Sequence, residues 1–179
     1  STARETLSPI KSHTAEPVIP SQFDEISIEE MEGKIKAAVK SCTIEHSDLV
    51  IVGRTDSLAV EGLDNAIARV KTYQKAGADI LFIEAPNQID DLKEINSKIE
   101  MPLLLNQIEG GQTPIISLED AQRLGFKIIL FPLTSLYAST KAIFDTFTSL
   151  MNKKTSTGSE NKLITFDLFN ELVNHDEFI

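Results

Sequence analysis

The chain has 179 residues and a formal net charge of −10. This length supports one domain with a hydrophobic core, but it falls short of the roughly 200–250 residues of a complete eight-unit (β/α) barrel. The acidic balance excludes general nucleic-acid binding, which needs clustered Lys and Arg. The single cysteine, Cys42, allows no intrachain disulfide, and no apolar run reaches the ~20 residues of a membrane span. We therefore expect a cytoplasmic protein, with an organellar location left open.

Hydrophobic periodicity predicts one helix followed by four strand–helix units. Residues 1–26 carry three prolines and no clear period, so we expect a loop there. The capping pair Ser27 and Glu30 precedes apolar residues at helical spacing, which predicts a helix over 28–41. We expect strands at 48–53, 79–84, 102–106 and 126–131, and helices from 63 up to Gly77, at 88–99, between Ser117 and Gly125, and at 134–152.

The predicted strands are continuous apolar runs, which is typical of strands covered on both faces. Strands that alternate with helices predict an α/β fold with a parallel sheet and right-handed crossovers. We expect a TIM-barrel-like body of four βα units over 27–152. A polar linker and a terminal helix at about 165–173 then occupy 153–179.

Polar side chains stand where successive predicted strands end. Arg54 and Asp56 follow the first strand, Glu84 ends the second, Asn106 ends the third and Pro132 follows the fourth. The carboxyl ends of parallel strands are where (β/α) barrels build their active sites. A cation, a carboxylate and an amide there predict a pocket for a small, oxygen-rich anion. Arg54 could instead pair with Glu84, and a turn or cap role is favoured for Asp56.

Several motifs in order resemble the isocitrate lyase/phosphoenolpyruvate mutase superfamily over residues 27–179. Together and at this spacing they are specific, although each alone is weak. They are Gly53-Arg54-Thr55-Asp56, Gly62-Leu63-Asp64-Asn65-Ala66, Ala76-Gly77-Ala78-Asp79, Phe82-Ile83-Glu84-Ala85, Pro102-Leu103-Leu104-Leu105-Asn106, Glu109-Gly110-Gly111-Gln112-Thr113-Pro114, Leu124-Gly125-Phe126-Lys127, Phe131-Pro132-Leu133-Thr134 and Thr165-Phe166-Asp167-Leu168.

This resemblance implies a Mg²⁺-dependent carbon–carbon bond lyase or hydrolase acting on 2-oxo or 2-hydroxy dicarboxylates, such as oxaloacetate, 2-alkylmalates or methylisocitrate-like compounds. It implies that Arg54 pairs with a substrate carboxylate and that Glu84 lies close to the reacting oxygens. Tyr137 stands where tricarboxylate-cleaving relatives place an arginine, which favours the oxaloacetate or 2-alkylmalate branch. The implied substrate-binding residues are Asn106, Glu109, Gly110, Gly111 and Pro132.

The chain also departs from the resembling family. The Asp-x-Asp metal ligands of that family have no counterpart in the sequence, so we predict no metal ligand in this chain. Residues 11–19 resemble at most a remnant of the gating loop. The match is therefore to the C-terminal half of the barrel, and we expect the isolated chain to be inactive while its parent is a Mg²⁺-dependent enzyme.

Two alternative functions remain open at this stage. One is a non-catalytic half-barrel that serves as an interaction module, because the family's metal carboxylates are missing. The other is a phosphoenolpyruvate mutase or phosphonate hydrolase. The resemblance also implies a homo-oligomer in which the C-terminal helix is exchanged between subunits.

Overall fold

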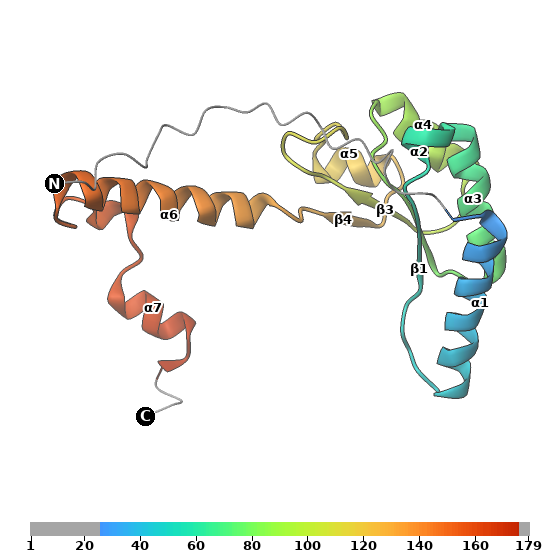
Figure 1. Ribbon diagram of the computed structural model, residues 1–179, viewed down its shortest axis with the longest axis horizontal. Coiled ribbons are helices and arrows are strands. Elements are labelled where there is room, and N and C mark those ends of the chain that lie inside the picture. Colours follow the sequence, from blue (N-terminus) through green and yellow to red (C-terminus); the bar gives the residue numbers. More distant parts are fainter. Residues whose placement is uncertain (1–25, 176–179) are drawn as a thin grey trace, which may run out of the picture. The chain divides into compact units, whose positions relative to one another are not determined.

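The computed structural model describes residues 26–175 (Figure 1). The predicted loop, or gating-loop remnant, at 1–26 lies outside these residues except for Ile26. The chain divides into two compact units, one ending at Pro132 and one starting at Leu133, and each is described by itself. The elements of the first unit are α1 (Ile28–Ile44), β1 (Val52–Thr55), α2 (Leu58–Glu61), α3 (Leu63–Ala76), β2 (Ile80–Ile83), α4 (Ile89–Lys98), β3 (Leu103–Asn106), α5 (Leu118–Arg123) and β4 (Ile128–Leu130).

The second unit is helical. It consists of α6 (Thr134–Lys153), the 3-10 turn η2 (Glu160–Lys162) and α7 (Phe166–Leu172). Lys154, the residue after α6, adopts a left-handed conformation with φ of 58°, and Thr165 caps α7 by accepting a hydrogen bond from Leu168 N. Within residues 26–175, no helix is both long enough and apolar enough to cross a membrane.

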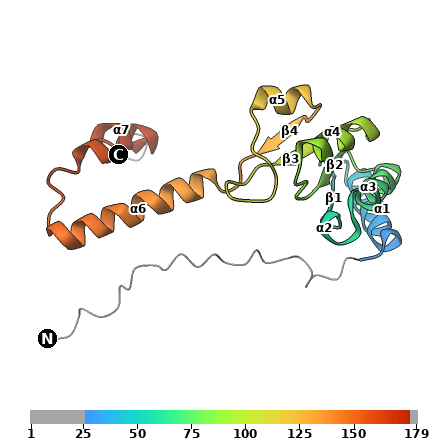
Figure 2. The same cartoon turned by 90° about the horizontal axis from the view of Figure 1, so that it is seen from above.

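The four strands form one parallel sheet in the order β1-β2-β3-β4, as the sequence predicted. The register aligns Arg54 with Phe82, Phe82 with Leu104, and Leu104 with Ile128. Figure 2 shows the same elements from above, with α1 and α3 beside each other at β1. A sequential parallel order places the carboxyl ends of all four strands at the same edge of the sheet.

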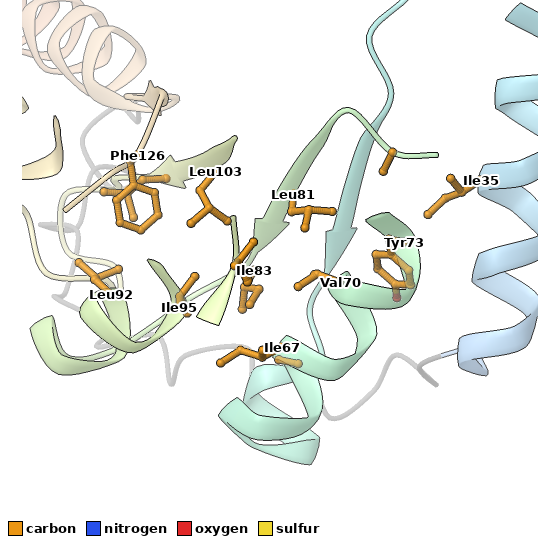
Figure 3. Packing of buried hydrophobic residues seen from close by; sticks show 14 of the residues in the cluster. Ile35, Ile67, Val70, Tyr73, Leu81, Ile83, Leu92, Ile95, Leu103 and Phe126 are labelled. Carbon is orange, nitrogen blue, oxygen red and sulfur yellow. The ribbon is translucent and has the colours of Figure 1, made fainter. Parts of the chain in front are cut away.

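The hydrophobic core lies between the sheet and the helices α3 and α4 (Figure 3). Leu81 and Ile83 of β2 and Leu103 of β3 are buried there, and α3 contributes Val70 and Tyr73. The core residues that Figure 3 labels are Ile35, Ile67, Val70, Tyr73, Leu81, Ile83, Leu92, Ile95, Leu103 and Phe126.

Gly53 of β1 allows close packing against α3. A Cβ at this position would lie 3.0 Å from the Cβ of Tyr73 and 3.2 Å from the Cβ of Ala78. Such contacts are tighter than nearly all Cβ contacts, so an alanine at this position would require Tyr73 or Ala78 to move by a few tenths of an ångström. The strand directly before the candidate site is therefore fixed by contact with α3.

Several details differ from the sequence-based expectations. α1 extends to Ile44 beyond the predicted end at 41, and β4 is shorter than the predicted strand 126–131. β1 begins at Val52, so the predicted start at 48 is wrong. Parallel pairing starts only there, and Leu49 and Val50 before it are exposed. The short helix α2 was not predicted. The expectation that both faces are covered holds for β2 and β3, but Val52 in the edge strand β1 and Leu130 in β4 are 40% and 41% exposed.

Candidate active site

A pocket of about 270 Å³ opens at the carboxyl ends of β1, β2 and β3. Arg54, Glu84 and Asn106, the three predicted strand-end residues of these strands, all line it. They come together because the sheet is parallel and sequential. The complete lining consists of Arg54, Asp56, Ala59, Glu84, Ala85, Asn106, Ile108, Gly111, Gln112 and Thr113.

Arg54 is the charged centre of this pocket. Its Nε donates to Oδ1 of Asp56 at 2.6 Å, and its Nη2 donates to Oδ2 at 2.9 Å. Nη2 also lies 3.2 Å from Oε2 of Glu84. The guanidinium packs 5.0 Å from the centre of the Phe82 ring, its partner in the strand register. The hydrogen bond to Asp56 raises the pKa of Arg54, so the group is a permanent cation.

Asp56 does not play the turn or cap role that the sequence favoured. Ser57, not Asp56, is the residue that precedes α2, and both carboxylate oxygens of Asp56 are held by Arg54. A planar guanidinium matches two carboxylate oxygens at once, which makes this bidentate pairing favourable. Asp56 is thus a site residue that sequence reasoning passed over. The ion pair between Arg54 and Glu84, raised as an alternative, is also present.

Glu84 is the most buried carboxylate of the pocket, with a side chain that is 20% exposed. Burial raises the pKa of Glu84 above its ordinary value of 4.5, and the charge of Arg54 opposes this shift. Asp56 raises the pKa further, and a hydrogen bond from Asn106 lowers it. A carboxyl group with a raised pKa keeps its proton to a higher pH than an exposed one, which suits it to proton transfer with a ligand.

Two buried acceptor atoms of the pocket residues lack a hydrogen bond within the part of the chain that the structure describes. They are Oε2 of Glu84 and Oδ1 of Asn106. The contact of Oε2 with Arg54 is an ion pair rather than a hydrogen bond. Buried acceptors without a donor are costly, so such groups often serve a ligand. A hydroxyl or a protonated carboxyl group of a ligand would supply the missing donor.

The loop after β3 forms another wall, but not with every predicted residue. Gly111 lines the pocket together with Gln112 and Thr113, whereas Glu109 and Gly110 are not among the lining residues. Gly110 has φ of 78°, and Gly111 N donates to Ile108 O, so the loop turns sharply here. Pro132 follows β4 and does not line this pocket either. The substrate-binding roles of these residues stay predictions.

The described side chains do not fit a Mg²⁺ ion held by this chain alone. Among residues 26–175, no group of three His, Cys, Asp or Glu side chains could hold a metal ion. The two carboxylates of the pocket both face Arg54, so a divalent cation placed between them would meet a guanidinium. Mg²⁺ requires nearly octahedral oxygen coordination. Whether this chain contributes a metal ligand stays a prediction.

The fold and the site together define a class: an α/β protein of the (β/α)-barrel type with a ligand pocket at its strand ends. A family model described as phosphoenolpyruvate phosphomutase matches residues 16–151. The chain belongs to this family, part of the PEP mutase/isocitrate lyase superfamily, and the resemblance stated from its motifs is confirmed.

Individual relatives support this assignment. The chain is 42% identical over 148 residues to 2,3-dimethylmalate lyase of Eubacterium barkeri, covering 83% of this chain and 50% of that protein. It resembles the structure of oxaloacetate acetylhydrolase in complex with the inhibitor 3,3-difluorooxalacetate, with a TM-score of 0.80 at 28% identity, covering 88% and 53% of the two chains. The chain thus spans about half the length of the curated relatives it matches.

A structure of phosphonopyruvate hydrolase in complex with oxalate and Mg²⁺ is also similar. It has a TM-score of 0.73 at 23% identity and covers 86% of this chain and 54% of that one. At this level of identity the similarity concerns the fold. A protein of the same fold thus binds Mg²⁺ in its structure. The described residues of this chain contain no group of three or more His, Cys, Asp or Glu side chains that could hold a metal ion.

Proposed function

We propose that the pocket binds a small 2-oxo or 2-hydroxy dicarboxylate, as part of a carbon–carbon bond lyase or hydrolase. The observation that carries this proposal is the convergence of Arg54, Glu84 and Asn106 on one pocket at the strand ends. The named activities of relatives support the substrate class, since 2,3-dimethylmalate and oxaloacetate are both dicarboxylates. The activity of the whole protein is part of this proposal.

Each residue has a role that follows from its chemistry. Arg54 binds a ligand carboxylate through guanidinium N–H donors that its two hydrogen bonds to Asp56 leave available. Glu84 holds or releases a proton next to the ligand, because burial keeps the pKa of Glu84 above that of an exposed carboxyl group. Asn106 hydrogen-bonds the ligand and fixes its orientation.

The family resemblance implies Mg²⁺ dependence. In this proposal, Mg²⁺ dependence applies to the whole protein and not to the 179-residue chain alone. The pocket offers the carboxylates of Asp56 and Glu84, and both are engaged by Arg54. Any Mg²⁺ ion of the whole protein would therefore need ligands in addition to those that residues 26–175 offer. The 179-residue chain should then bind the anion without turning it over.

Phosphonate chemistry is a second candidate, favoured by the phosphoenolpyruvate phosphomutase family model. A phosphonate differs from a carboxylate in offering three oxygens and a larger charge to Arg54. A non-catalytic interaction module is a third candidate, favoured by the missing metal site in the described part of the chain. The phosphonate candidate predicts that the pocket binds a phosphonate more tightly than a dicarboxylate. The interaction-module candidate predicts that it binds neither.

We also propose that the chain forms a homo-oligomer through its C-terminal helices. In the second unit, α6 and α7 carry large apolar side chains that are exposed, among them Phe147 at 63% and Phe166 at 79%. Apolar patches of this kind mark interaction sites. Light scattering should give a mass above that of one chain, and Phe147→Ser should lower it; a wild-type monomer would contradict the proposal.

Calorimetry with oxalate and phosphonoacetate tests the binding proposal on the 179-residue chain. We expect saturable 1:1 binding of oxalate that is lost in Arg54→Ala and weaker binding of phosphonoacetate. Tighter binding of phosphonoacetate would favour the phosphonate alternative. Binding of neither ligand by the folded chain would refute the binding proposal and favour the interaction module.

A further inference from the structure

A buried arginine in α3, Arg69, is paired with Glu61 of the short helix α2. Its side chain is only 5% exposed. Nε and Nη2 each donate to a carboxylate oxygen of Glu61 at 2.7 Å, and Nη1 donates to the carbonyl oxygen of Ile26 at 2.9 Å. An isolated buried charge would be costly, so the pairing with Glu61 is needed to keep the arginine inside. The bidentate geometry also fixes the orientation of both side chains.

Glu61 connects this arginine to the site. It is the last residue of α2, the helix that supplies Ala59 to the pocket wall. Its carboxylate accepts hydrogen bonds from Arg69 and from Ser57, and these lower the pKa of Glu61, the Arg69 bond most. α2 is only four residues long, too short to be stable by itself. The anchor at Glu61 therefore holds the helix in place together with Leu58, which packs against the core.

The connection continues to the residue that holds Arg54. Ser57 is fully buried, and its Oγ accepts a hydrogen bond from Oγ1 of Thr55 at 2.9 Å. Ser57 N donates to the same Thr55 oxygen at 3.2 Å. Asp56 lies between these two buried and bonded residues. The backbone at Asp56 is thus held on both sides, while its carboxylate remains at the pocket.

We infer that Arg69 and Glu61 form a positioning pair for the candidate site. The pair fixes α2 and, through Ser57, the backbone of Asp56, so that Asp56 aligns the guanidinium of Arg54 for a ligand carboxylate. The effect of the pair on ligand binding rests on the proposed function. The effect of the pair on the orientation of Arg54 does not, because the contacts between these residues exist without a ligand.

Two variants test the pair under conditions where the chain stays folded. Arg69→Lys keeps the charge but loses the bidentate geometry, and Glu61→Gln weakens the same contact from its more exposed side. Ile95→Ala serves as the control, since Ile95 is a buried apolar residue of α4 outside the pocket lining. Circular dichroism and melting temperature establish that each variant is folded at the temperature of the assay.

Two readouts separate positioning from simple stabilisation. The NMR signal of the Arg54 Nε–H group, assigned by its loss in Arg54→Lys, is recorded without ligand. Oxalate affinity is then measured by calorimetry. We expect both pair variants to shift the Arg54 signal and to weaken oxalate binding by about 10-fold, the lower end of the loss seen when partners that orient metal ligands are mutated. Ile95→Ala should lower the melting temperature and leave both readouts unchanged.

The Arg54 signal and the melting temperature of the pair variants decide between positioning and stabilisation. Folded pair variants that melt earlier but keep the wild-type Arg54 signal would overturn it and leave the pair a purely stabilising role. Should Arg69→Lys fail to fold, Glu61→Gln decides, because Glu61 is partly exposed. If the wild type binds no oxalate, the proposed function fails, and the Arg54 signal alone decides the inference.

Discussion

Replacing Arg54 by alanine is the most direct perturbation of the candidate site. The guanidinium makes two hydrogen bonds to Asp56, of 2.6 and 2.9 Å, and a 3.2 Å ion pair with Glu84. Its removal deletes the donor for a ligand carboxylate and leaves two carboxylates at the pocket without their cation. Both effects weaken anion binding.

The size of the effect follows from these contacts. A hydrogen bond to a charged group contributes about 1.5–3 kcal/mol, which corresponds to a roughly 10- to 150-fold change in affinity. Once Arg54 is gone, the carboxylates of Asp56 and Glu84 repel the anionic ligand. We therefore expect the affinity to fall at least by the roughly 10-fold lower end of this range. The Arg54 side chain is 50% exposed, and exposed ion pairs contribute only about 0–1 kcal/mol to stability. The variant should therefore fold and still fail to bind.

Isothermal titration of the 179-residue chain with oxalate measures this effect. Arg54→Lys keeps the charge without the bidentate geometry, so its affinity should fall between those of the wild type and Arg54→Ala. Arg123→Ala is the matched control, because Arg123 is an exposed arginine of α5 paired with Asp120, outside the pocket lining. A folded Arg54→Ala variant that binds oxalate as tightly as the wild type would refute the assignment of Arg54.

Three further predictions concern packing, protonation and metal binding. Gly53→Ala should lower the free energy of unfolding in urea by about 1–3 kcal/mol through overpacking against Tyr73, whereas Gly33→Ala, with open space around it, should not destabilise α1. Because the folded state binds the extra proton, wild-type stability falls as pH rises from 4.5 through the raised pKa of Glu84. Glu84→Gln should remove this loss and be the more stable protein above that window; equal stability at every pH would contradict the assigned burial effect. Titration of the isolated chain with Mg²⁺ should show no saturable binding, and assays with oxaloacetate and 2-alkylmalates no metal-dependent turnover; either signal would reveal ligands missed here.

The sequence predicted the fold well where the pattern reflects burial. β2 and β3 are buried on both faces, so their apolar runs were unambiguous and their bounds agree to within one residue. β1 was predicted too long because Leu49 and Val50 have the composition of a strand but no partner strand to pair with. α2 was missed because four residues are too few to show a helical period of apolar side chains.

The sequence predicted those residues of the candidate site that stand at the carboxyl ends of strands. Arg54, Glu84 and Asn106 each end a strand or directly follow one, so a parallel order alone brings them together. Asp56 was assigned a turn role because a carboxylate before a helix commonly caps it. The choice between capping and pairing depends on where the Arg54 side chain points, which sequence spacing does not determine.

The formal charges of the pocket connect its anion site with the question of the metal. Arg54, Asp56 and Glu84 sum to −1, and a bound dicarboxylate would bring the total to −3. Charges of one sign confined to a half-buried pocket repel each other. The pKa of Glu84 is raised mainly by burial, and repulsion from Asp56 adds to this shift. A dianion can therefore bind well only with a compensating positive charge. In this chain alone, the available charge is a proton on Glu84, so oxalate binding should strengthen as pH falls. A cation held by groups beyond residues 26–175 would supply the compensating charge instead, and oxalate binding would then no longer depend on the protonation of Glu84.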